Sequence, residues 1–64
     1  MDKKAVIQTA SRLFYTQNTM EDVRQQIMDQ SQMDGTGFIV ISSYGHIHDI
    51  NIQHIEFISY TDRK

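Results

Sequence analysis

Apolar side chains between residues 5 and 14 recur at intervals that fit one face of an α-helix. The set consists of Val6, Ile7, Ala10, Leu13 and Phe14. This spacing follows the helical period of about 3.6 residues, so all five would lie on one stripe. Asp2 precedes the segment, and a carboxylate there can cap a helix and favours the positive end of its dipole. The pattern therefore predicts a first helix near the N-terminus.

A second helix is expected after residues 15–19, a polar segment made of poor helix formers. Asn18 followed by Glu21 resembles the capping box that opens a helix. Thr19 followed by Asp22 does so equally well. The apolar positions that continue with helical spacing are Met20, Val23 and Ile27. The helix should end before residues 34–35, Asp-Gly, because glycine readily adopts the left-handed conformation that closes many helices.

An alternative is one unbroken helix over residues 3–33. Val6, Leu13, Met20 and Ile27 are spaced by seven, as along the seam of a coiled coil. The second seam of that helix would hold Thr9, Thr16, Val23 and Gln30, which is too polar for good packing. Two helices are therefore preferred.

The pattern changes after Gly35. Residues 37–45, GFIVISSYG, contain four consecutive apolar residues and end in a turn signal, residues 46–52 alternate, and residues 55–60 form a third strand candidate. Short connections favour antiparallel pairing of these neighbours. We expect an α+β fold with two N-terminal helices followed by a small antiparallel sheet of two to three strands. Residues 1–64 would form one domain, with a helical half (1–34) and a β half (35–64).

The predicted strands are apolar on both faces, whereas an antiparallel sheet with one face in water alternates cleanly. Two short helices can cover one face, and the chain has no further element for the other. We therefore expect a homo-oligomer, in the simplest case a dimer, or a protein partner to cover it. Either Phe38 and Val40 or Ile39 and Ile41 would lie on the free face. The expected interface is drawn from Phe38, Ile39, Val40, Ile41, Ile55, Phe57, Ile58 and Tyr60.

Composition adds limits to this interpretation. A chain of 64 residues buries only about 60% of its unfolded surface, so its stability is marginal without added support. Cysteine is absent, which excludes disulfides and thiolate metal sites. No apolar run approaches the roughly 18 residues of a membrane span, and the N-terminus lacks the features of a secretory signal, so the cytoplasm is the expected location. Six basic residues are scattered among eight acidic ones, which disfavours nucleic-acid binding.

The stretch GHIHDINIQH, residues 45–54, holds three histidines. On a strand, His46 and His48 project from one face about 7 Å apart, and a metal ion bound there would need further ligands. A two-residue turn at 51–52 provides none. A three-residue turn at 51–53 would instead gather His46, His48, His54 and Glu56 on one face, so the register decides between a metal site and ordinary strand side chains. Protonation of the imidazoles toward pH 5 could also give a pH response.

Catalysis finds little support in the sequence. Ser42 and Ser43 precede the histidines, but a small sheet with two helices offers no obvious cleft for a substrate. Residues 34–37, DGTG, resemble the active-site triplet of aspartic proteases, whose larger β-fold this helix-first chain lacks. We expect no enzyme activity and no cofactor.

Residues 50–58, INIQHIEFI, resemble in pattern the last strands of small barrel modules such as Sm-like folds. That resemblance implies RNA binding, which the helix-first order and the few basic residues disfavour, and we assign no family from it. The expected function is that of a small non-enzymatic interaction or regulatory protein that associates with itself or with a protein partner. A metal- or pH-responsive module is the alternative, and a nucleic-acid-binding protein a weaker one.

Overall fold

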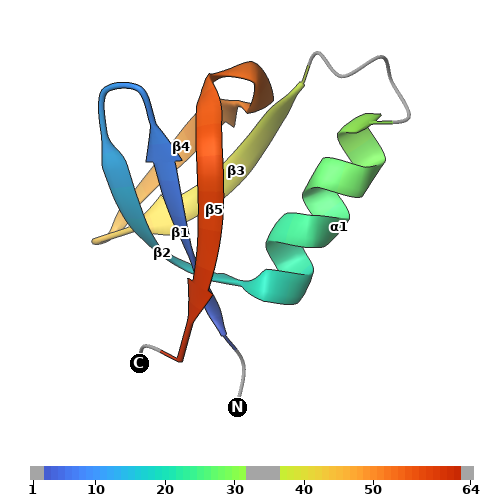
Figure 1. Cartoon of the computed structure of the whole chain (residues 1–64). Helices are drawn as coiled ribbons and strands as arrows, with labels where there is room; N and C mark the ends of the chain where they lie inside the picture. Colours follow the sequence, from blue (N-terminus) through green and yellow to red (C-terminus); the bar gives the residue numbers. More distant parts are fainter. Residues whose placement is uncertain (1–2, 32–36, 63–64) are drawn as a thin grey trace.

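The computed structural model describes residues 3–31 and 37–62 and contains five strands and one α-helix in this part of the chain (Figure 1). The elements are β1 (Lys4–Thr9), β2 (Leu13–Thr19), α1 (Met20–Ser31), β3 (Phe38–Ser43), β4 (His46–Asn51), the 3₁₀ turn η1 (Ile52–His54) and β5 (Ile55–Thr61). Strands β2, β1 and β5 form one antiparallel sheet in that order, called sheet A here. Strands β3 and β4 form a second antiparallel sheet, called sheet B.

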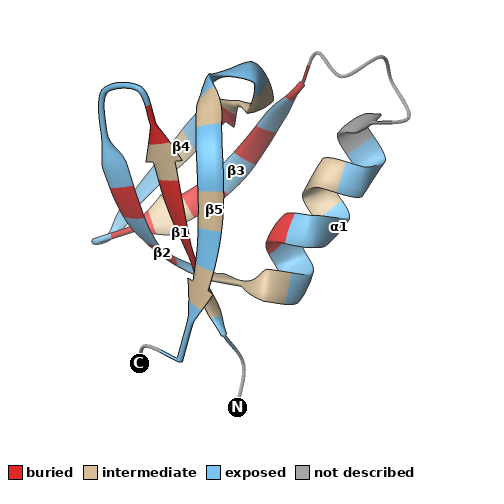
Figure 2. Cartoon of the chain, viewed as in Figure 1, coloured by how far each residue is buried: buried red, intermediate tan, exposed pale blue. Residues whose placement is uncertain are grey.

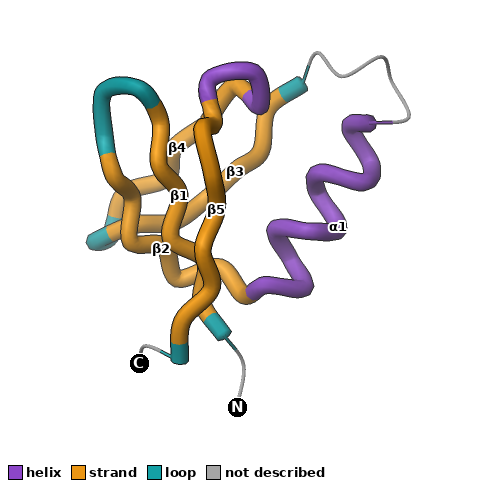
Figure 3. Tube along the Cα trace, in the orientation of Figure 1, coloured by secondary structure: helices purple, strands orange, loops and turns teal. Residues whose placement is uncertain are grey.

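The expectation of two N-terminal helices followed by a sheet is wrong. Residues 4–9 and 13–19, predicted as mostly helical, are strands, and the single α-helix follows them (Figure 3). In β2, Phe14 and Thr16 are buried while Leu13, Tyr15 and Gln17 are exposed, an alternation with a period of two. The helical stripe was a coincidence of two short apolar groups, which periodicity alone cannot assign to helix or strand.

The long-helix alternative is wrong as well, but the prediction for the start of the second helix is confirmed. Helix α1 begins at Met20, and the backbone N–H of Asp22 donates to the side-chain oxygen of Thr19 over 3.2 Å. Thr19 is therefore the N-cap. Glu21 and Asp22 place two carboxylates in the first turn, where the helix dipole favours them. The predicted stop at residues 34–35 lies outside the described residues.

Strand β1, the first strand of the chain, is the central strand of sheet A and pairs with β5, the last strand described. Its residues pair with β2 on one side and β5 on the other, so that Ile7 lies between Phe14 and Ile58. Ala5 and Ile7 are fully buried in the core, and Val6, on the opposite face of the strand, is nearly buried. A tight turn joins β1 to β2, closed by a 2.8 Å hydrogen bond from the Thr9 N–H to the Arg12 carbonyl.

Strands β3 and β4 form the predicted hairpin. Ser43 pairs with His46 across the two-residue turn Tyr44–Gly45. Both turn residues have positive φ, 50° for Tyr44 and 82° for Gly45, as a hairpin turn matched to the strand twist requires. The expectation that β4 and β5 are also antiparallel neighbours is wrong: η1 turns the chain away, and β5 pairs with β1.

The hydrophobic core lies between the two sheets, which face each other in Figure 1. Its buried members come from four strands and the helix: Ala5, Ile7, Phe14, Val23, Ile39, Ile41 and Ile50. Helix α1 contributes Val23, which is fully buried, and Ile27, which packs against the cluster. The remainder of the helix is largely exposed (Figure 2). The inner face of each sheet is thus covered by the other sheet, and not by two helices as expected.

Side-chain amides join the two sheets where β2 and α1 meet β3. The N–H of Val40 donates to Oε1 of Gln26 over 2.8 Å, and Nε2 of Gln26 donates to the Val40 carbonyl over 2.9 Å. The N–H of Ser42 donates to Oδ1 of Asn18 over 2.8 Å, and the Ser43 hydroxyl donates to the Tyr15 carbonyl over the same distance. The hydrogen bonds of Gln26 and Asn18 satisfy backbone groups of β3 that do not pair with β4. This edge of β3 is therefore occupied by its own chain.

Candidate functional site

Each sheet also has an outer face that no described element covers completely. Residues directly paired across antiparallel strands project to the same face, so the ladder defines both outer faces. The sheet A face consists of three rows, Thr19–Lys4–Thr61, Tyr15–Val6–Ser59 and Leu13–Gln8–Phe57. The sheet B face consists of three pairs, Phe38–Asn51, Val40–Asp49 and Ser42–Ile47.

The sheet A face carries no charge in the rows of Val6 and Gln8. Its charged residue is Lys4, in the row at one end, where Nζ donates to the Gln17 carbonyl over 3.2 Å. Leu13, Tyr15 and Phe57 are 43%, 42% and 55% exposed, and they surround Val6, which is only 8% exposed. The side chain of Gln8 donates to the Thr9 and Arg12 carbonyls at 2.6 and 3.2 Å, so its amide is bonded within its own turn. This face therefore presents the side chains of one leucine and two aromatic residues around the buried Val6.

The sheet B face mixes apolar and charged groups. Phe38 and Val40 are 55% and 46% exposed, and Ile47 is 70% exposed. Asp49 lies directly opposite Val40, so a carboxylate sits in the middle row of the face. Burying this face against another protein would remove that carboxylate from water, which is costly without a partner charge.

The predicted interface residues divide into three groups. Ile39 and Ile41 are core residues, 0% and 1% exposed, and are not on a free face. The partly buried residues that pack against the core from β5 are Ile55, Ile58 and Tyr60. Those on an outer face are Phe38, Val40 and Phe57. The sequence interpretation missed Leu13 and Tyr15, although their alternation with Phe14 and Thr16 was a usable signal.

The histidines do not form the four-residue cluster that one of the two turn registers would have produced. His46 and His48 share a face of β4, with ring centroids 6.3 Å apart. His54 lies after the end of β4, in the 3₁₀ turn η1. Neither of the turn registers considered for β4 and β5 applies, because these strands do not pair. Within residues 3–31 and 37–62, no group of three or more histidine or carboxylate side chains is placed to hold a metal ion.

The ring of Phe14 has an aromatic and a cationic neighbour. The His48 imidazole lies at a centroid distance of 5.1 Å, tilted by 60°, and the guanidinium carbon of Arg12 lies 4.6 Å from the ring centroid. A second contact between an arginine and an aromatic ring joins α1 to β5: the guanidinium carbon of Arg24 lies 5.3 Å from the Tyr60 ring centroid. Both arginines are exposed, so these contacts orient the side chains and add little stability.

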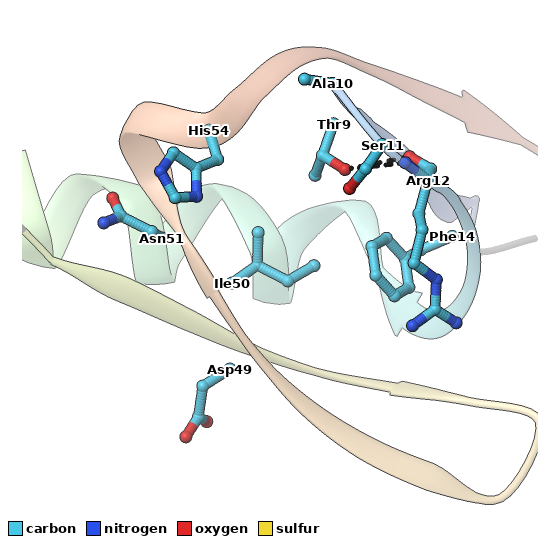
Figure 4. Close-up of a pocket in the computed structure, with 9 residues that line it drawn as sticks. All are labelled: Thr9, Ala10, Ser11, Arg12, Phe14, Asp49, Ile50, Asn51 and His54. Carbon is cyan, nitrogen blue, oxygen red and sulfur yellow. Dashed lines mark hydrogen bonds between the residues drawn. The ribbon is translucent and has the colours of Figure 1, made fainter.

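A hollow of about 400 Å³ lies between the β1–β2 turn and the end of β4 (Figure 4). Its lining residues are Thr9, Ala10, Ser11, Arg12, Phe14, Asp49, Ile50, Asn51 and His54. In Figure 4 the side chains of Phe14 and Ile50 lie between His54 and Arg12, and the Asp49 carboxylate points away from the others. Phe14 and Ile50 are buried core residues, so the hollow has an apolar floor and a polar rim.

Two further candidates have little structural support. The Ser42 N–H donates to Oδ1 of Asn18. Ser43 pairs with His46 across the hairpin, but its hydroxyl donates to the Tyr15 carbonyl and not to a histidine base. Residues 34–36 of the DGTG stretch lie outside the described residues.

Among the described residues, α1 is too short and too polar to cross a membrane.

Comparison with protein-family models, with curated proteins and with solved structures finds no match for this chain. The resemblance of residues 50–58 to Sm-like modules therefore stays one of pattern. These residues cover the end of β4, η1 and the start of β5. The candidate functional surfaces thus rest on this chain's own geometry: the sheet A face, the sheet B face and the hollow beside Phe14.

Proposed function

We propose that this protein is a small, non-enzymatic interaction module that associates with a second copy of itself through the sheet A face. The observation that carries the proposal is the exposure of Leu13, Tyr15 and Phe57 around the buried Val6, in two adjacent rows without charge; Lys4 lies in the row at one end of the face. Charge depletion and aromatic enrichment are what distinguish the centre of a protein interface from other surface.

The sheet B face is the rival surface, and Asp49 argues against it. In a two-fold contact across that face, the carboxylates of both copies would be buried near the contact centre. The edge of β3 is also an unsuitable route, because Gln26 and Asn18 already bond its backbone. On the sheet A face the middle row, Tyr15–Val6–Ser59, has no charge, and Lys4 lies in the row at one end.

A standard interface buries about 800 Å² per partner. That is nearly a fifth of the 4402 Å² accessible surface of the chain. At roughly 25 cal/mol per Å² of apolar surface, such burial would add several kcal/mol before the costs of association are subtracted. A domain of this size gains markedly from that support.

Lysine substitutions at matched positions test the choice of face. Leu13 and Val40 are 43% and 46% exposed, and Phe57 and Phe38 are both 55% exposed, so each pair should perturb the fold equally. We expect Leu13→Lys and Phe57→Lys to dissociate the assembly while Val40→Lys and Phe38→Lys leave it intact. Sedimentation equilibrium at tens of micromolar reports the mass, and circular dichroism checks that each variant is folded.

The reverse pattern would refute the sheet A face while leaving self-association in place. A wild-type species of 7.5 kDa at that concentration would refute self-association itself. The module would then be one that binds a different protein, and the same lysine pairs would locate the surface in a pull-down with that protein.

A further inference from the structure

The hollow between the β1–β2 turn and the end of β4 is lined by none of the residues that form the rows of Val6 and Gln8 on the sheet A face, although it shares Asp49 and Asn51 with the sheet B face. Its composition is that of a ligand site. Small-molecule pockets are typically about 300–1,000 Å³, mostly apolar, with a few converging polar groups. This hollow has a volume of about 400 Å³. Its floor is formed by Phe14 and Ile50, which are 7% and 6% exposed, so an apolar group placed there would contact the core directly.

The cation on the rim of the hollow is not neutralised within the described part of the chain. The one ion pair recorded among residues 3–31 and 37–62 joins Lys3 to Asp62, at the two chain ends. Arg12 is held instead over the ring of Phe14, with its guanidinium carbon 4.6 Å from the ring centroid. Its donors remain available to an anion beside the apolar floor.

The carboxylate that lines the hollow does not compete for Arg12. Asp49 is on the outer face of sheet B, opposite Val40, and its carboxylate points away from the other lining side chains in Figure 4. The other hydrogen-bonding side chains on the rim include Ser11, Asn51 and His54, and none of these three is a carboxylate. The hollow therefore favours a negative group at its rim over a positive one.

The backbone of the β1–β2 turn is fixed, so the position of Arg12 is defined. The Arg12 N–H donates to the Thr9 side-chain oxygen over 3.1 Å, and the Thr9 N–H donates to the Arg12 carbonyl over 2.8 Å. Gln8 also donates to the Arg12 carbonyl over 3.2 Å. A turn held by three hydrogen bonds presents its side chain with little loss of backbone entropy on binding.

From this geometry we propose that the hollow binds a carboxylate attached to an apolar, preferably aromatic, group. The apolar part packs on Phe14 and Ile50, and the carboxylate bonds the Arg12 guanidinium, a pairing that planar, forked geometry favours. Two sources share this chemistry: a free aromatic acid, and the C-terminal carboxylate of a peptide that ends in an aromatic residue. This inference is independent of self-association through the sheet A face.

Phenylacetate is a suitable first probe, titrated into the protein and followed by amide and methyl chemical shifts. For a ligand of this size we expect a dissociation constant on the order of 1 mM. The shifts should be saturable and centred on the β1–β2 turn and the Ile50 methyl groups. Phenethylamine has the same ring and the opposite charge, and it should not produce them.

Arg12→Gln should weaken phenylacetate binding about tenfold, because a charge-assisted hydrogen bond is lost. Arg24→Gln is the matched control, since Arg24 also lies over an aromatic ring, at 5.3 Å from the Tyr60 centroid, but does not line the hollow. Its binding should equal that of the wild type. Both substitutions are at exposed positions, so both variants should fold.

The two sources are separated by a short acetylated peptide ending in phenylalanine, with and without C-terminal amidation. Tighter binding of the free-acid peptide than of phenylacetate assigns the site to protein C-termini, and the reverse assigns it to a free acid. Absence of saturable shifts with both probes would refute the proposal. Equal binding of phenylacetate by the wild type and Arg12→Gln, or equal binding of phenethylamine, would refute it as well.

Discussion

The amide of Gln26 acts in this fold as a substitute for a neighbouring strand, and its removal should have a measurable cost. Its side chain bonds both backbone groups of Val40, at 2.8 and 2.9 Å, and Nε2 also donates to Asp22 over 3.1 Å. Without it, the Val40 N–H has only water as a partner on that side of β3, and the Val40 carbonyl keeps only the long 3.4 Å hydrogen bond from Nδ2 of Asn18. Gln26→Ala should therefore destabilise the protein.

Gln25→Ala is the control that isolates this effect. Gln25 is the preceding residue of the same helix, so the change in helix propensity is nearly the same in both variants. Its amide donates to Asp29 over 3.0 Å, a contact between exposed residues four apart that is worth about 0.2–0.5 kcal/mol.

The expected difference follows from the two lost backbone hydrogen bonds. Each contributes about 1 kcal/mol net, and the partly exposed setting lets water replace some of that. Gln26→Ala should therefore be about 1–2 kcal/mol less stable than Gln25→Ala. With an m-value of about 1 kcal/mol/M, the urea midpoint should fall by about 1–2 M relative to the control.

A third variant separates the two hydrogen bonds. In Gln26→Glu the carboxylate can still accept from the Val40 N–H, but it cannot donate to the Val40 carbonyl, and it adds a second negative charge beside Asp22. At pH 7 this variant should be no more stable than Gln26→Ala. If Gln26→Ala and Gln25→Ala have the same urea midpoint, the idea that Gln26 completes the edge of β3 is wrong.

Three further substitutions test other parts of the fold. Ile7→Val should lower the free energy of unfolding by about 1 kcal/mol because Ile7 is fully buried, whereas Ile47→Val, at a position 70% exposed, should change it by under about 0.3 kcal/mol; similar effects in thermal melts would contradict the placement of the core. Tyr44→Asn should raise the melting temperature by a few degrees, since Asn tolerates the φ of 50° better than Tyr and the Tyr side chain is 78% exposed; a loss of stability would indicate an unrecognised contact of that ring. Replacing the three histidines together by glutamine should change stability at pH 7 by under about 1 kcal/mol in chemical denaturation, and a larger loss would mean that they do more than occupy strand and turn positions. The substituted residues are His46, His48 and His54.

The histidine cluster shows why local pattern could not decide the candidate metal site. Both turn registers that bear on the histidine cluster require β4 and β5 to pair as consecutive strands. The side chain of Asn51 accepts from the Gln53 N–H over 2.9 Å and opens the 3₁₀ turn η1, which redirects the chain toward β1. The pairing of β5 was thus decided by a strand almost fifty residues earlier in the sequence.

The features that could be predicted correctly from the sequence are those whose contacts join residues only a few positions apart. Thr19 caps α1 because its side-chain oxygen reaches the N–H of Asp22, three residues later. The hairpin of β3 and β4 forms around Tyr44–Gly45, where a turn signal interrupts two strand-like segments. The absence of cysteine and the scattered charges likewise limited the chemistry from the composition alone.

The secondary structure of residues 4–19, in contrast, depends on contacts between distant parts of the chain. Their short apolar groups fit a helix face and a strand equally well, so the choice depends on which arrangement buries them. As a strand, β1 places Ala5 and Ile7 against sheet B while its backbone pairs with β2 and with β5 from the far end of the chain. The same long-range pairing sets Leu13, Tyr15 and Phe57 around Val6, because residues of three strands share a face only once their register is fixed.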